Sequence, residues 1–186
     1  MKHIGYFLAI IVTCCLESCS GNTDTATPRP VAYPRLSVAS EKYHAVTAGN
    51  ITFEVNDVTI DSIFNRDAST WMNITYPTYC NNSVIYCTIT PAKPVEFDRV
   101  VENRLERIAL NLGGSESVVT DLTTPDGWDC QLIRALSPVV TPLQFIATNK
   151  PNIVTGAYYI ATPGDSVMPY VDAVERDIIH LLKTIK

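Results

Sequence analysis

The sequence has no basic run, and its overall charge is acidic. Lys and Arg number 14 against 19 Asp and Glu, which leaves a formal net charge of −5. Proteins that bind nucleic acid concentrate positive charge to neutralise phosphates, so this composition argues against a nucleic-acid partner. It also gives anionic lipid nothing to attract, so attachment to a membrane must come from another feature.

Residue types and motifs that build catalytic and metal sites are scarce as well. The chain has three histidines and lacks a Cys-x-x-Cys pair, a Gly-x-Ser-x-Gly motif and a glycine-rich phosphate loop. His180 lies in a helical stretch with no orienting partner indicated. The carboxylates of Glu102, Glu106, Asp172 and Glu175 are typical of solvated helix faces. We therefore expect no catalytic residue, no metal and no cofactor.

The one long apolar run lies at the N-terminus, where residues 4–16 follow Lys2. The run is shorter than the ~20 residues that a membrane-spanning helix needs, and it is typical of a secretory signal. It ends in Leu16-Glu17-Ser18-Cys19, which supplies the apolar residue, the small residue and the thiol that a lipoprotein signal peptidase requires. We predict that residues 1–18 are a lipoprotein signal peptide and that Cys19 is lipidated. The alternative is an uncleaved N-terminal anchor, which also places the domain outside the cytoplasm.

A polar stretch rich in Thr, Pro, Gly and Asn follows Cys19. Pro28, Pro30 and Pro34 stiffen its end toward an extended conformation. Two or more acyl chains such as palmitate on Cys19 would make release from a bilayer slow. We predict that residues 19–35 are the lipidated cysteine with a flexible leash and that residues 36–186 form a single domain.

The first half of the domain alternates apolar and polar residues at period two, as strands do. The pattern covers residues 51–55, 58–64, 71–76 and 83–89. A two-residue turn at Asn81-Asn82 would place Tyr76 opposite Cys87 and Ile74 opposite Ile89. One face of this predicted hairpin then carries Met72, Ile74, Tyr76, Ile85, Cys87 and Ile89.

The second half starts with a helical period and returns to strands. An apolar stripe runs from Phe97 to Leu112 and stops at Gly113-Gly114, a typical C-terminal cap. Strand patterns cover residues 117–123, 128–135, 143–149 and 153–161, and Asp165-Ser166 predicts the N-cap of a last helix. The buried stripe of that helix is predicted to be Val167, Val171, Val174, Ile178, Leu181 and Ile185. This order predicts an α+β domain: an antiparallel β-sheet, made of N-terminal strands and a hairpin and then a four-strand meander, covered by two amphipathic helices.

The domain holds an odd number of cysteines, so at least one is free or pairs between chains. The predicted hairpin places Cys80 at its turn and Cys87 in the core, too far apart for a disulfide. Cys130 shares a face with Trp128 and Leu132 and should also point inward. A Cys87–Cys130 bridge would need neighbouring strands, and we expect buried thiols instead.

Short motifs along most of the chain carry a family resemblance. They are residues 71–77, Ile85-Tyr86, residues 144–148, residues 156–159, residues 163–169 and residues 177–184. With the motif that ends at Cys19, they resemble the gliding motility lipoprotein GldD family of the Bacteroidetes. Departures at Thr70 and Ala135-Leu136 mark a divergent member. The resemblance implies a non-enzymatic accessory role in the gliding and type IX secretion machinery, anchored in the cell envelope through Cys19, facing the periplasm and bound to envelope proteins.

A second hypothesis comes from another class of protein. A periplasmic lipoprotein could bind or sense a small ligand between sheet and helix, and an enzyme is the third alternative. A buried cavity lined by Trp71 and Trp128 would favour the ligand-binding protein. A closed core with an exposed apolar patch would favour a component of an assembly.

Overall fold

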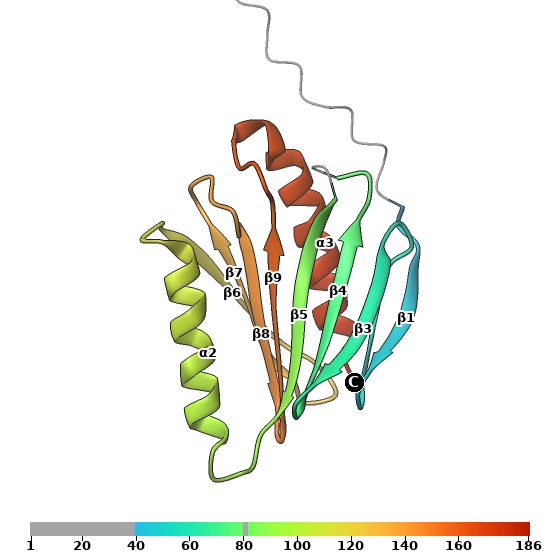
Figure 1. Cartoon of the computed structure of the whole chain (residues 1–186), viewed down its shortest axis with the longest axis vertical. Coiled ribbons are helices and arrows are strands. Elements are labelled where there is room, and N and C mark those ends of the chain that lie inside the picture. Colours follow the sequence, from blue (N-terminus) through green and yellow to red (C-terminus); the bar gives the residue numbers. More distant parts are fainter. Residues whose placement is uncertain (1–39, 80–81) are drawn as a thin grey trace, which may run out of the picture. The chain divides into compact units, whose positions relative to one another are not determined.

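The computed structural model describes residues 40–79 and 82–186, which form a seven-stranded sheet, a two-stranded sheet and two α-helices (Figure 1). The α+β class, the large antiparallel sheet and the two helices are therefore confirmed. The predicted signal peptide, Cys19, the predicted leash and Cys80 lie outside the described residues. Neither of the two helices is long and apolar enough to cross a membrane.

The large sheet has the strand order β3-β4-β5-β9-β8-β7-β6, and all neighbours in it are antiparallel. Its strands are β3 (Ile60–Arg66), β4 (Ser69–Tyr76), β5 (Ser83–Pro91), β6 (Ser117–Thr123), β7 (Asp129–Ala135), β8 (Leu143–Asn149) and β9 (Asn152–Tyr159). The chain thus enters at one edge, crosses from β5 to the far edge at β6, and returns strand by strand to β9 beside β5.

The first two strands form a separate sheet, so the predicted place of the strand at residues 51–55 in the main sheet is wrong. β1 (Tyr43–Ala48), which the sequence pattern did not indicate, pairs with β2 (Ile51–Asn56). The tight connection between them uses Gly49 at φ 65°, a left-handed conformation that glycine adopts without steric cost. Phe53 and Val55 of β2 then pack into the same core as the last helix rather than extending the sheet.

The predicted face of the β4–β5 hairpin is confirmed, but its register and two-residue turn are wrong. Tyr76 pairs with Ser83 and Ile74 with Ile85, so the connection is longer than two residues. The register moves by an even number of positions, which keeps the same side chains in the core, all at most 2% exposed. The physical cause is Tyr79, which the loop folds inward so that its ring stacks on Tyr76 at 5.2 Å between centroids.

Helix α2 (Phe97–Leu112) has the predicted limits, and Gly113 ends it at φ 58°. Helix α3 (Met168–Thr184) starts later than predicted. Residues Asp165–Val167 form a 3₁₀ turn, the N-cap is Val167, and no side chain caps the helix. The predicted Asp165-Ser166 cap is therefore wrong. Pro169 is tolerated in the first turn because backbone N–H groups there have no hydrogen-bond partner within the helix.

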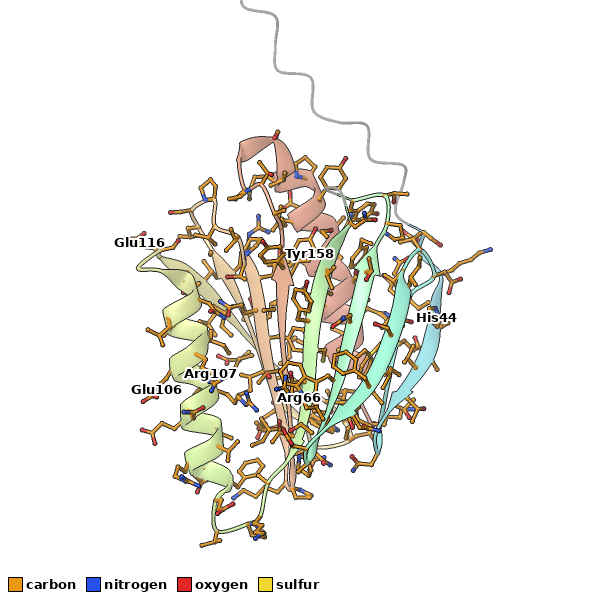
Figure 2. The ribbon with its side chains drawn as sticks, viewed as in Figure 1. His44, Arg66, Glu106, Arg107, Glu116 and Tyr158 are labelled. Atoms are coloured by element: carbon orange, nitrogen blue, oxygen red, sulfur yellow. The ribbon has the colours of Figure 1, made fainter. Side chains whose placement is uncertain are left out.

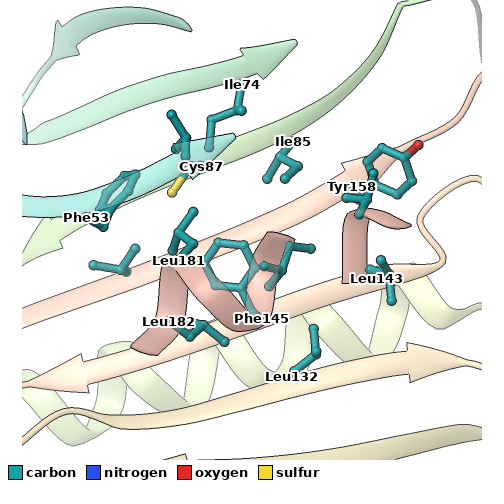
Figure 3. Packing of buried hydrophobic residues seen from close by; sticks show 14 of the residues in the cluster. Phe53, Ile74, Ile85, Cys87, Leu132, Leu143, Phe145, Tyr158, Leu181 and Leu182 are labelled. Carbon is teal, nitrogen blue, oxygen red and sulfur yellow. The ribbon is translucent and has the colours of Figure 1, made fainter. Parts of the chain in front are cut away.

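The two helices lie on opposite faces of the large sheet (Figure 1). The main core lies between the sheet and α3, where Phe145, Leu181 and Leu182 pack together (Figure 3). On the other face, α2 contributes Phe97 and Ile108 to a smaller cluster against Ile133, Ile146 and Ile153.

Cys87 and Cys130 are both free and buried, as expected. Their strands, β5 and β7, are separated by β9 and β8, so a bridge between them is ruled out by topology. Burial raises the pKa of Cys87 to about 12. Burial, with the charge of Asp129, raises the pKa of Cys130 to about 11. Both therefore behave as small apolar core residues.

Candidate functional site

His180 has the orienting partner that the sequence did not indicate. Its Nε2 lies 2.7 Å from Oε2 of Glu54 on β2, and its ring stacks on Tyr43 with the centroids 3.7 Å apart. These contacts join α3 to the β1–β2 hairpin. The signal was hidden because the three residues are far apart in the sequence and only the fold brings them together.

The predicted solvated carboxylates divide into two groups. Glu102 and Glu106 are exposed on α2, as predicted. Asp172 and Glu175 both pair with Arg134 of β7, and their side chains are 59% and 23% exposed. The Asp172 Oδ1 lies 2.7 Å from Nη2 of Arg134. These pairs fasten α3 to the sheet. The prediction of a solvated side chain is confirmed for Asp172 and is wrong for Glu175, which is partly buried.

Asp177 is a buried carboxylate that the sequence analysis missed. It lies on α3 beside the apolar stripe and is 6% exposed. Its Oδ1 accepts hydrogen bonds from the Tyr43 hydroxyl and from Asn56 Nδ2, each at 3.0 Å. Its Oδ2 accepts one from the Tyr76 hydroxyl at 3.1 Å. The sequence offered one signal of this buried carboxylate: Asp177 comes three residues after Val174 and directly before Ile178, both of which belong to the predicted buried stripe.

Burial dominates the electrostatics of this cluster. Burial raises the pKa of Asp177 above its ordinary value, and the three hydrogen bonds offset only part of that shift. Burial and the adjacent Asp177 raise the pKa of Tyr43 to about 12 and that of Tyr76 well above its ordinary value. Both phenols therefore remain protonated donors at neutral pH. The hydrogen bonds of this cluster connect β1, β2, β4 and α3, so we interpret the cluster as stabilising the fold.

The two tryptophans lie on opposite faces of the sheet. Trp128 is 2% exposed in the main core, as predicted. Trp71 alternates with buried Met72 on β4 and so points to the other face, where it is half-buried and stacks on Phe64 at 6.3 Å between centroids. A tryptophan in a strand is more often a core residue, but Trp71 is not one, and the two rings cannot line one cavity.

The surface around Trp71 carries several large apolar side chains and is left uncovered by α2. We call it the open face: the outward side chains Ile60, Phe64, Trp71, Tyr86 and Tyr159 of β3, β4, β5 and β9. Ile60, Phe64, Tyr86 and Tyr159 are between 39% and 63% exposed. The rings of Tyr86 and Tyr159 lie 6.2 Å apart.

A basic cleft borders the open face where α2 meets β5. Two hollows of about 130 and 340 Å³ share Arg104 and Arg107 in their walls, and the larger also includes Arg99. The Nη2 of Arg104 donates to Oγ1 of Thr90 on β5 at 3.1 Å. Figure 2 shows Arg107 on the side of α2 toward the strands and Glu106 on its outer side. We call this group of Arg99, Arg104 and Arg107 the basic cleft.

The motifs that carried the resemblance meet in the folded core. Phe145 of β8 lies opposite Gly156 of β9, where a Cβ would overlap the phenylalanine ring. Gln144 is 1% exposed and holds α2 to the sheet, accepting from Asn111 at 3.0 Å and donating to the backbone of Ile108 at 3.3 Å. These motifs therefore encode packing between elements.

Comparison with protein families gives a match over most of the chain. The family model described as "Gliding motility lipoprotein GldD" matches residues 23–186. The resemblance that the motifs indicated is thereby confirmed. No curated protein matches the chain at a significant level.

Proposed function

The chain belongs to the gliding motility lipoprotein GldD family, and on that basis we propose that it is a non-enzymatic accessory component of the gliding and type IX secretion machinery. The observation that carries this proposal is the family match over residues 23–186. Membership of a lipoprotein family associates the protein with the cell envelope. The accessory role follows from the family and from an apolar surface suited to binding another protein.

The proposed anchor is the lipid on Cys19. Cleavage after Ser18 would leave residues 19–35 as a leash between the bilayer and the domain, which we propose faces the periplasm. An extended chain reaches at most ~3.3–3.6 Å per residue, so this leash keeps the domain close to its own membrane. The partners are therefore expected to be envelope proteins assembled at that surface.

The core and the surface support an assembly component over a ligand-binding protein. Trp71 and Trp128 were the residues expected to line a ligand cavity, and they lie on opposite faces of the sheet. The open face instead presents several large apolar side chains to solvent among polar ones, with Ile60 63% and Tyr86 48% exposed. Large exposed apolar side chains gathered on one face support a site of protein association.

A deletion strain tests the proposed function. We expect loss of the protein to lower the amounts of partner lipoproteins and to impair secretion, and the wild-type gene to restore both. Normal secretion with unchanged partner levels would refute the proposal. It would favour the ligand-binding alternative, whose own sign would be a thermal shift of the protein on addition of a periplasmic metabolite.

A further inference from the structure

The open face has the side-chain composition of a protein interface. Tyr, Trp, Phe and Arg are the residue types enriched at the energetic centre of interfaces. Here Phe64 and Trp71 are cross-strand partners and Tyr86 and Tyr159 lie on neighbouring strands, while polar Thr88 and Asn73 lie directly opposite Trp71 and Tyr86 on the same face. An outward sheet face exposed to water would ordinarily carry polar side chains.

The basic cleft contains two positive charges, those of Arg104 and Arg107, that the described part of the domain does not neutralise, whereas Arg99 pairs with Glu96 at 3.8 Å. Among residues 40–79 and 82–186, neither Arg104 nor Arg107 pairs with a carboxylate. Burial lowers the pKa of Arg104, and the charge of Arg107 lowers it further, so the two guanidinium groups repel each other. Glu106 points away from them on the outer side of α2 (Figure 2). An anion between them would relieve this repulsion.

We propose that the open face and the basic cleft together bind a protein partner through an acidic segment that also carries apolar side chains. The segment places a carboxylate between Arg104 and Arg107 and lays its apolar side chains on the rings of Phe64, Trp71 and Tyr86. This proposal rests on the proposed function, because it locates the surface through which an envelope partner binds.

Charge complementarity identifies the occupant. A guanidinium group takes a carboxylate in a planar, two-pronged hydrogen-bonded pair. The chain as a whole carries a net charge of −5, so an acidic partner is repelled elsewhere and directed to this region. The smaller of the adjoining hollows, about 130 Å³, has the size of one side chain, the larger, about 340 Å³, has room for more than one, and Tyr86 in the wall of the smaller hollow joins the cleft to the open face.

Site-specific photocrosslinking in the full-length protein, expressed in its own envelope, tests the proposal. A benzophenone amino acid replaces Tyr86, which is 48% exposed at the centre of the open face. We expect a crosslink to one discrete protein, with mass spectrometry placing the linked residue in an acidic segment. The same amino acid in place of Glu106, on the outer side of α2, is the matched control and should give no such product.

Charge reversal in the crosslinking background tests the role of the cleft. Arg107 makes no hydrogen bond or ion pair within the described part of the chain, so Arg107→Glu leaves the fold intact. We expect it to lower the crosslink yield about tenfold, since like charges at an interface oppose binding strongly. Lys183→Glu makes the same change in charge at an exposed position on α3 and should leave the yield unchanged.

Several results would contradict the proposed docking surface. They are a crosslink to a second copy of this chain, a crosslink to lipid, a linked segment without acidic residues, or full yield in Arg107→Glu. Complementation of the deletion strain tests the docking surface separately from the proposed function. If deletion impairs secretion but Arg107→Glu restores it completely, the docking surface is wrong while the function stands; if deletion has no effect, the function itself is wrong.

Discussion

At the scale of single residues, Asp177 holds three strands and a helix through one carboxylate. Asp177→Ala would leave the hydroxyl of Tyr76, a residue that is 1% exposed, without a partner. Each buried polar group left unsatisfied costs ~1–3 kcal/mol, so we expect a loss of about 3 kcal/mol or more in the free energy of unfolding. Asp177→Asn keeps an acceptor and should cost less. Denaturant unfolding compares the two variants, and equal small losses would contradict the structural role.

The same residue predicts a dependence on pH. Burial raises the pKa of Asp177 above the ordinary value of 3.8, so the folded state holds this proton more tightly than the unfolded state does. Its contribution to stability is fully present below the ordinary pKa and is lost as pH rises through the folded pKa. The stability of the wild type relative to Asp177→Asn should therefore fall as pH rises above about 4. A difference that grows with pH would show that the pKa is lowered instead.

Glycine is required at position 156 because the ring of Phe145 fills the space that a Cβ would occupy. A Cβ on Gly156 would overlap the ring of Phe145, which is 0% exposed and cannot move aside. We expect Gly156→Ala to lower the free energy of unfolding by about 2–3 kcal/mol through overpacking. Gly164→Ala is the matched control, since a Cβ there meets no atom within 4 Å. Thermal unfolding of the two variants tests this prediction. Equal unfolding midpoints would contradict the close packing of Phe145 against Gly156.

At the scale of elements, the two helices are bound to the sheet with unequal strength. α2 buries only Phe97 and Ile108, whereas α3 buries residues along its whole length, including Val171, Val174 and Leu181. Regions with few buried apolar contacts open locally at lower free energy. We expect backbone amides of α2 to exchange hydrogen faster than those of α3 in the native protein. Equal protection of the two helices, measured by mass spectrometry, would contradict this packing.

The sequence predicted what depends on local periodicity and missed what depends on long-range contact. The limits of α2 follow from its apolar stripe and Gly113, and the strand pattern identified the core face that holds Met72 and Cys87. The hairpin register failed because it depends on how Tyr79 packs against Tyr76. Asp177 was missed because its partners come from β1, β2 and β4, and the basic cleft because only the fold brings α2 beside β5.

At the scale of the whole molecule, the proposed function requires attachment to the envelope, and Cys19 is the predicted site of the lipid. We expect wild-type protein to incorporate an alkyne fatty acid and to fractionate with membranes, and Cys19→Ala to lose both properties. Cys14→Ala changes a thiol within the same apolar segment and should keep both. Equal labelling of Cys19→Ala and the wild type would show that the lipid is attached elsewhere or is absent.

The central claim is that this protein acts as an envelope component bound to other proteins. Crosslinking in native membranes, followed by purification of the full-length protein, measures this most directly. We expect recovery of gliding and secretion lipoproteins with the wild type, and a clear loss of them with Arg107→Glu at equal protein amount. Recovery of the protein alone after crosslinking, in a strain that assembles the machinery normally, would contradict it.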